Sequence, residues 1–292
     1  VEVATSAESF AHIFKFFAGR DPWTTDIVME PPGMVRLSGR AVLFPLNIGI
    51  GQGKLEIWEV NGDTGARRCK KPDAVFALDA TGNWGPFKAR GGAQYEFNVV
   101  RDGMETHHFY FQPFIRSNHW LRLQLSNPTY GGSAAYMDKG EAHSTLVISR
   151  NKEFWGDQGA QNDILTLNGI NIINAATCPV VKGAYRTGVI GIYAYDKGAD
   201  GITDLAAPIP YFYSVSFMSG VDVVIPAASP ANATTSAVLM PRGGCGALQV
   251  INFPNWVSST DRISILFNDF VDSRCNQKWS AHQMPGKDCG RW

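Results

Sequence analysis

The 292-residue chain carries 26 Lys and Arg against 26 Asp and Glu, so its net charge is zero and its pI is about 7.1. This balance argues against a nucleic-acid partner, which normally requires a basic excess. No apolar run approaches the roughly 18 residues of a transmembrane helix, whereas 45% hydrophobic residues provide for a sizeable core. The 30 Gly, 16 Pro and 12% aromatic residues favour an all-β protein with many turns.

The chain opens with its one clear helical pattern, over residues 5–19. Large apolar residues recur there at the i, i+3, i+4 and i+7 spacing of one helix face: Phe10, Ile13, Phe14 and Phe17. Thr5 and Glu8 have the spacing of a capping box, and Gly19 supplies a C-terminal stop. Because a lone helix cannot bury four such side chains, we expect residues 1–33 to be a helix and linker that belong to a domain further upstream. The alternative is that the helix packs on the edge of a sandwich.

Residues 34–127 show a period near two that is broken by Gly and Pro, which predicts a first β-sandwich. The candidate strands are Met34–Phe44, Lys54–Val60, Ala74–Leu78, Tyr95–Arg101, His107–Phe114 and His119–Leu125. The stretch 79–97 lies at the centre of this module. Thr81-Gly82-Asn83 is a turn there, and Gly85-Pro86 interrupts the chain before the next strand.

A second β-sandwich is predicted for residues 140–271. Its candidate strands are Ser144–Ser149, Asp163–Leu167, Val189–Tyr195, Tyr211–Phe217, Val221–Ile225, Thr235–Leu239, Leu248–Phe253 and Arg262–Phe267. No repeat of about 20–50 residues is present, which excludes a propeller or solenoid. The expected fold is therefore all-β, with two consecutive β-sandwich or barrel modules after one amphipathic helix. Residues 272–292 form a polar, cysteine-containing tail.

The five cysteines form no CxxC pair and no zinc-ligand spacing; they are Cys69, Cys178, Cys245, Cys275 and Cys289. We favour a disulfide between Cys275 and Cys289 over free thiols, and this indicates a secreted or extracytoplasmic protein. The odd number leaves at least one cysteine without an intramolecular partner. No signal peptide is visible at Val1, so we expect the chain to be processed, truncated or excised from a longer one.

The sequence contains no G-x-S-x-G elbow, no Gly-rich phosphate loop and no HExxH motif. The nearest candidates for a metal or catalytic set are His107, His108 and His119. If His107 and His119 both point inward on adjacent strands, their imidazoles would meet, and neutral imidazole is a common metal ligand. No Asp, Glu or Cys joins them at a fixed spacing, so structural histidines inside an aromatic sandwich are the favoured interpretation.

Asp196, Asp200 and Asp204 in the segment DKGADGITD resemble a calcium loop, because carboxylate oxygens around a tight turn suit Ca²⁺. However, Gly198 stands where such loops carry a second Asp, and Ala207 stands where a bidentate Glu would close the site. A plain acidic turn is the favoured interpretation. We expect at most weak Ca²⁺ binding, in the millimolar range typical of extracellular modules.

Aromatic residues gather in short runs along the predicted strands. Neighbouring residues of a strand point to opposite faces, so these runs cannot all enter one core. An exposed apolar patch usually marks a ligand or partner surface. The predicted contacts to a partner, lipid or other ligand are Phe109, Phe111, Phe114, Trp120, Phe154 and Trp155. The alternative is that the neighbouring module covers both faces.

Several segments resemble the C-terminal region of a family of secreted bacterial and archaeal lipases: VRLSGRAVLFP, KLEIWEVNGDTGAR, DATGNWGPF, YEFNVVR, HHFYFQPFIRSNHWLRL, NKEFWGDQGAQNDILTLNG and DKGADGITDL. The resemblance extends from Val1 to about Asp269. In that family an α/β-hydrolase domain precedes a lipid-binding β-rich region, whose first module is similar to prealbumin-like modules. The opening VEVATSAESF is similar to the segment after the family's catalytic His. The resemblance therefore places the triad upstream, and we assign no catalytic residue in this chain.

The resemblance implies an accessory lipid- or substrate-binding region of a secreted lipase or esterase, whose ester chemistry is performed by the missing hydrolase domain. The chain alone is not expected to be catalytic. The alternative is a self-standing extracellular structural or binding protein, such as an envelope or filament module. Its edge strands and an unpaired cysteine would allow a homo-oligomer. A hydrolase complete in these 292 residues is a third, less favoured hypothesis.

Overall fold

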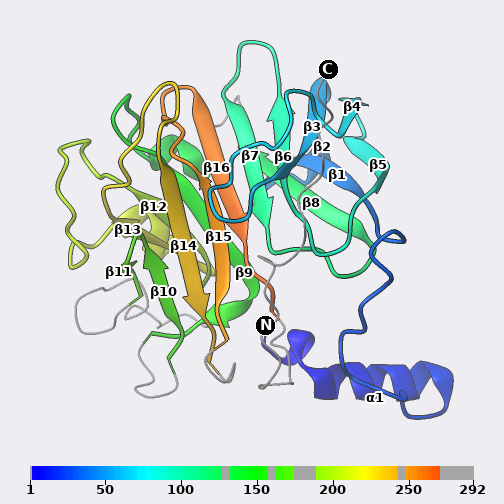
Figure 1. Cartoon of the computed structure of the whole chain (residues 1–292). Helices are drawn as coiled ribbons and strands as arrows, with labels where there is room; N and C mark the ends of the chain where they lie inside the picture. Colours follow the sequence, from blue (N-terminus) through cyan, green and yellow to red (C-terminus); the bar gives the residue numbers. More distant parts are fainter. Residues whose placement is uncertain (1, 127–131, 157–161, 174–188, 243–246, 270–292) are drawn as a thin grey trace.

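The computed structural model describes residues 2–126, 132–156, 162–173, 189–242 and 247–269. Within these residues the chain is all-β, as its composition predicts, with three sheets and only two short α-helices (Figure 1). The tail at 272–292 and the predicted Cys275–Cys289 disulfide lie outside the described residues, so the pairing of the cysteines stays a prediction.

Eight strands from both halves of the chain form one central sheet. They are β3 (Gly53–Val60), β4 (Ala74–Leu78), β6 (Gln94–Val100), β7 (Thr106–Phe111), β9 (Leu146–Phe154), β12 (Val189–Tyr195), β13 (Met218–Asp222) and β16 (Asp261–Leu266). Their order in the sheet is β13-β12-β9-β16-β7-β6-β3-β4. The junction is β16, which pairs in parallel with β7 on one side and with β9 on the other. The two predicted modules therefore share a sheet, and their boundaries at 34–127 and 140–271 stay predictions.

Two smaller sheets cover opposite faces of the central sheet. The N-terminal sheet consists of β1 (Arg36–Phe44), β2 (Ile48–Gly49), β5 (Asn83–Lys88) and β8 (Asn118–Ser126). The C-terminal sheet consists of β10 (Ile164–Leu167), β11 (Ile170–Asn171), β14 (Thr234–Met240) and β15 (Gln249–Pro254). Each small sheet packs on its own half of the central sheet, and Figure 1 shows the two sandwiches side by side.

Strand β7 shows why the two small sheets must lie on opposite faces. Phe109 and Phe111 pack in the core of the N-terminal sheet, whereas Tyr110 between them packs in the core of the C-terminal sheet. The Tyr110 ring lies 5.7 Å from that of Phe253 on β15. Strand alternation thus sends this aromatic run into two cores. For this run, the interpretation that neighbouring modules cover both faces is confirmed.

The helix α1 (Ala7–Ala18) follows a short 3₁₀ turn, η1 (Glu2–Thr5), and contains no buried residue. Its N-cap is Ser6, whose hydroxyl accepts a hydrogen bond from the Ser9 backbone N–H at 3.1 Å. The predicted capping box of Thr5 and Glu8 is therefore wrong, because the helix begins two residues later than predicted. Gly19 ends the helix in the left-handed conformation, with φ of 67°, as its sequence position predicts.

Two segments depart from the predicted strands. Part of the predicted strand Tyr211–Phe217 is instead the helix α2 (Pro210–Ser214), because proline at the first helical position has its φ already fixed for a helix. Strand β5 continues across Gly85-Pro86, which the sequence marks as an interruption. A register shift in the β1–β5 pairing accommodates these two residues. A second 3₁₀ turn, η2 (Ser133–Tyr136), precedes β9.

Candidate functional site

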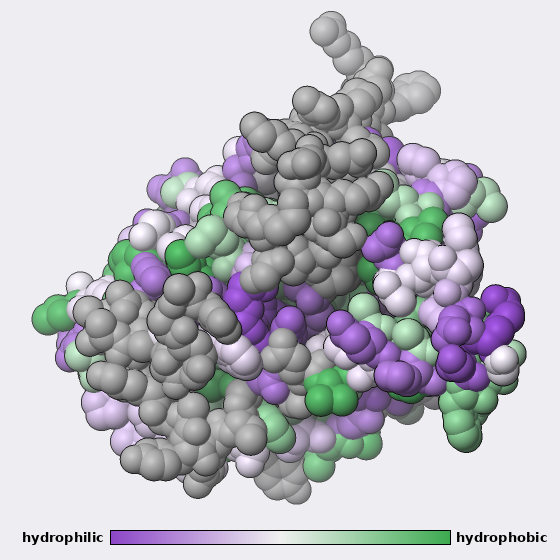
Figure 2. All heavy atoms as spheres, turned by 90° about the horizontal axis from the view of Figure 1, so that it is seen from below, coloured by the Kyte–Doolittle hydropathy of each residue, from purple (hydrophilic) through white to green (hydrophobic). Residues whose placement is uncertain are grey.

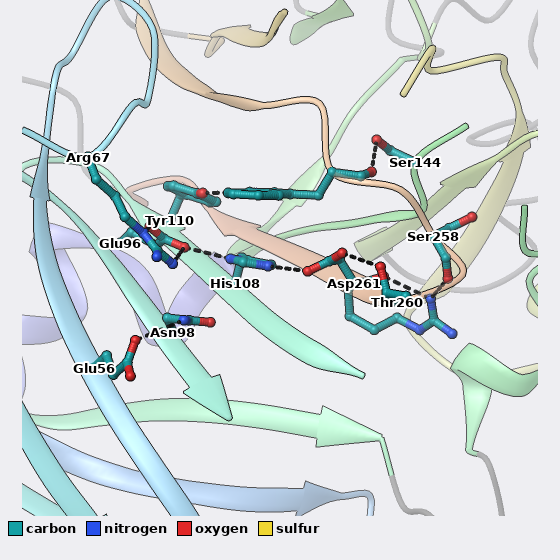
Figure 3. A network of polar contacts seen from close by, with 12 residues as sticks. Glu56, Arg67, Glu96, Asn98, His108, Tyr110, Ser144, Ser258, Thr260 and Asp261 are labelled. Atoms are coloured by element: carbon teal, nitrogen blue, oxygen red, sulfur yellow. Dashed lines mark hydrogen bonds and ion pairs between the residues drawn. The ribbon is translucent and has the colours of Figure 1, made fainter. Parts of the chain in front are cut away.

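A row of charged side chains crosses the junction of β6, β7 and β16, on the Tyr110 face of the central sheet (Figure 3). Glu96 is fully buried, and its Oε1 lies 2.5 Å from Nδ1 of His108. The other ring nitrogen of His108, Nε2, lies 2.7 Å from Oδ1 of Asp261. These three residues, together with Arg67, are the seam network. They connect the two halves of the central sheet.

Arg67 completes the seam network from the loop between β3 and β4. Its Nε and Nη2 donate hydrogen bonds to the two carboxylate oxygens of Glu96 at 2.7 and 2.9 Å. The guanidinium lies over the Trp58 ring, 4.3 Å from its centroid. The His108 ring stacks on Trp256, with centroids 4.5 Å apart and an interplanar angle of 7°. The charged groups are therefore paired with one another and enclosed by aromatic rings.

Burial and hydrogen bonding act in opposite directions on the two central groups. Burial acts to raise the pKa of Glu96, but hydrogen bonds from His108 and Arg67 outweigh it and lower that pKa to about 2. Burial acts to lower the pKa of His108, but its hydrogen bonds to Asp261 and Glu96 raise that pKa above the ordinary value. In both groups the hydrogen bonds of the seam network therefore favour the ionised form over the neutral one.

The seam network is a structural clamp. Both ring nitrogens of His108 are engaged by carboxylates, so the imidazole has no free nitrogen with which to take a proton from a serine. The nearby hydroxyl of Thr260 donates to Asp261 Oδ2 at 2.6 Å. The sequence analysis missed Glu96 and Asp261 altogether. For Glu96 the sequence does carry a signal, because this charged residue stands inside a predicted strand between two large aromatic residues.

The other two histidines each meet a serine. His107 Nε2 lies 2.8 Å from Ser264 Oγ in the core, and His119 Nδ1 lies 2.9 Å from Ser38 Oγ at the surface. In the described part of the chain, neither histidine has a carboxylate partner to complete a triad. The inward position predicted for His119 is wrong: a register shift in the β1–β8 pairing turns it outward. The three histidines therefore do not converge on a common point.

Each aspartate of the predicted calcium loop accepts hydrogen bonds from the backbone of its own turn. Asp196 is buried, and its carboxylate accepts backbone N–H groups of the same loop at 3.0 and 3.2 Å. Asp200 and Asp204 are exposed, and each accepts the backbone N–H two residues further along. Among the described residues, no group of three or more His, Cys, Asp or Glu side chains is placed to hold a metal ion.

The six aromatic residues predicted to contact substrate fall into different environments. Phe109, Phe111 and Phe154 are buried in the two cores, where they pack against other side chains and offer no surface. Phe114 is partly buried against the same core as Phe109. Trp155 lies under the guanidinium of Arg242, 3.9 Å from the ring centroid. Trp120 is 90% exposed, and of the six it has the position that a ligand contact requires.

Exposed apolar side chains concentrate at the start of the chain. Ten of the twenty large hydrophobic side chains exposed among the described residues belong to this N-terminal arm: Val3, Phe10, Ile13, Phe16, Phe17, Trp23, Ile27, Val28, Met29 and Met34. Figure 2 views the molecule from the side on which α1 lies in Figure 1. Among the residues coloured in that view, hydrophobic side chains stand between hydrophilic ones. Half of the exposed large hydrophobic side chains of the described residues therefore belong to the arm.

The fold is an all-β double sandwich preceded by an arm whose apolar side chains are exposed. Residues 33–128 match the family model of the lipase C-terminal domain, and residues 132–271 match a second model, described as a C-terminal domain. The first match supports an accessory domain of a lipase. Among the described residues, no helix is both long enough and apolar enough to span a bilayer.

Other comparisons add little. No match is found among curated proteins. Among solved structures, a double mutant of the shaft pilin SpaA from Lactobacillus rhamnosus GG is similar at 10% sequence identity. That similarity covers 80% of this chain and 95% of the pilin, with a TM-score of 0.21, which is too low to carry an argument about fold or function.

Proposed function

We propose that this chain is the accessory region of a secreted lipase or esterase, and that it binds lipid or ester substrate while a separate hydrolase domain performs the chemistry. The match of residues 33–128 to the lipase C-terminal domain supports this assignment. The observation that carries it is the N-terminal arm, whose apolar side chains are exposed although the two cores of the sandwiches are complete.

The helix α1 needs a partner on energetic grounds. It has 12 residues, none of them buried, and isolated helices shorter than about 12–15 residues are marginal in water. Phe16 and Phe17 are 82% and 81% exposed. Burying one such ring contributes roughly 1.5–3 kcal/mol. A hydrolase domain that covers the apolar stripe would therefore stabilise both the helix and the association.

The same physics gives the accessory region a role toward substrate. Each CH₂ of an acyl chain gains about 0.8 kcal/mol on burial, so additional apolar surface favours long-chain over short-chain esters. Export is part of the proposal, and it is supported by Cys69. This is the one cysteine within the described residues, and it is disulfide-bonded. Disulfides persist mainly in oxidising, extracytoplasmic environments.

The test compares the hydrolase domain with and without this chain, as one polypeptide in each case. The expected result is that deletion lowers kcat/KM for long-chain esters and leaves short-chain esters nearly unchanged. Replacing Phe10 and Phe17 by serine on the apolar face of α1 should reproduce part of that loss. The matched control, His12→Ser with Lys15→Ser on the opposite face of the same helix, should not.

An unchanged preference for chain length after deletion would contradict the proposal. If the isolated chain then forms defined multimers, the alternative of an envelope or filament module would be favoured. Ester hydrolysis by the isolated chain would overturn the placement of the catalytic triad in another domain.

A further inference from the structure

The N-terminal sheet is strongly basic in a protein whose net charge is zero. Its four strands contain no Asp or Glu. They contain four cationic side chains: Arg36, Arg40, Lys88 and Arg122. Their strand neighbours Leu37, Ala41, Phe87 and Leu123 are buried in the core, so alternation places the four cations on the outer face of the sheet.

The strand register sets these cations opposite one another. Arg36 pairs with Lys88 across β1 and β5, and Arg40 pairs with Arg122 across β1 and β8. Like charges that face each other directly across strands destabilise a sheet. None of the four forms an ion pair within the described residues. The guanidinium of Arg40 donates to the backbone carbonyl of Thr81, which leaves its charge unneutralised.

One carboxylate beside this sheet, that of Glu30, is already engaged. Ser117 Oγ donates to it at 2.6 Å, and Arg116 approaches it to 4.0 Å. Within the described residues it forms no ion pair with any of the four cations.

The same outer face carries Trp120, which follows the start of β8 and is 90% exposed. Tryptophan combines a large apolar body with one N–H donor, and it is favoured where an apolar phase meets water. Lys and Arg add about 1 kcal/mol each near an anionic leaflet. A face that combines paired cations with one exposed indole therefore matches the surface of an anionic bilayer.

We propose that the outer face of the N-terminal sheet binds the surface of membranes that contain anionic phospholipids, through Arg36, Arg40, Lys88, Arg122 and Trp120. This rests on the proposed function and deepens it, by naming the lipid class and the face that meets it. Single-stranded nucleic acid fits less well. Its recognition uses several aromatic platforms in a groove, whereas Trp120 is the one exposed aromatic side chain on these four described strands.

The test is co-sedimentation of the full chain with phosphatidylcholine vesicles, prepared with and without phosphatidylglycerol. Binding is expected with phosphatidylglycerol only, and it should weaken as salt is raised. The variant Lys88→Gln with Arg122→Gln removes one cation from each facing pair. Both side chains are exposed and form no hydrogen bond or ion pair within the described residues, so the fold should be retained. We expect roughly 30-fold weaker binding.

The matched control is Lys70→Gln with Lys71→Gln. These two lysines are exposed in the loop between β3 and β4, outside the N-terminal sheet. This control changes the net charge equally and should bind like the parent chain. Equal binding to both vesicle types, equal loss in both variants, or binding of a single-stranded oligonucleotide without binding of vesicles would overturn the inference.

The vesicle assay involves no ester hydrolysis, so its result is separable from that of the proposed function. If the chain does not bind vesicles but its deletion still affects long-chain esters, only the proposed membrane-binding face is contradicted. If the chain binds vesicles but its deletion has no effect on those esters, only the proposed coupling to a hydrolase domain is contradicted.

Discussion

The seam network and the N-terminal arm both depart from the usual rule that apolar side chains are buried and charged ones exposed. The seam network buries charged groups, and the arm exposes apolar ones. At the seam, a fully buried Glu96 lies between His108 and Arg67, whereas in the arm large apolar side chains such as Phe17 face solvent. Buried polar groups and exposed apolar groups are the informative exceptions in a folded protein. The seam shows how the molecule holds its own halves together. The arm carries apolar side chains that the described sandwiches leave exposed.

The largest effect is expected from breaking the seam. Glu96→Gln leaves the buried His108 and the half-buried Arg67 without their shared carboxylate. Removing one partner of a buried ion pair costs about 3–5 kcal/mol. Urea unfolding should report a loss of this size in the free energy of unfolding. Glu141→Gln, at an exposed position, is the matched control and should change that free energy by less than about 0.5 kcal/mol.

A smaller effect is expected from pH. The folded pKa of Glu96 is depressed from 4.5 to about 2, so its stabilisation is present above pH 4.5 and is lost as the pH falls toward 2. The shift corresponds to about 3 kcal/mol. The folded pKa of His108 is raised above 6.5, so its stabilisation is present below 6.5 and is lost as the pH rises through the raised value.

Thermal unfolding as a function of pH should therefore show one maximum between these two limits. The Glu96→Gln variant should lose the acid limb of that profile. An unchanged acid limb in the variant would mean that another carboxylate governs unfolding in acid.

The smallest effect is expected in the arm. Phe10→Ser with Phe17→Ser should change the unfolding free energy of the isolated chain by no more than about 0.5 kcal/mol, because exposed side chains contribute little. Calorimetry checks this directly. A loss above about 1.5 kcal/mol would show that the arm packs on the sandwiches, as the alternative interpretation of the helix holds, and the contrast with the seam would disappear.

Local pattern was sufficient for many of the elements. The strands Ala74–Leu78 and Val189–Tyr195 have the predicted bounds, because each is a short apolar segment between turn residues. The segment at Tyr211 is also short and apolar, but it forms a helix, because Pro210 precedes it and the Phe212 ring stacks on that of Tyr193. There the tertiary contacts outweigh the strand propensity of aromatic residues.

The seam network could not be predicted in the same way. His108 and Asp261 are 153 residues apart and meet only because β7 and β16 pair in parallel. Such a pairing leaves no periodic signal in the sequence. For Trp120 the sequence indicated an aromatic contact, but which face of β8 is covered depends on its pairing with β1, which follows from the fold.

The position of β16 has a consequence for how the protein is made. Residues 261–266 emerge from the ribosome after all other strands described, yet they fill the gap between β7 and β9 in the middle of the central sheet. Until then, both strands present bare edges, with unpaired N–H and C=O groups that invite pairing with other chains. Nascent or truncated chains that stop short of residue 261 should therefore be the aggregation-prone species. Neither sandwich should be obtainable by cutting the protein between them.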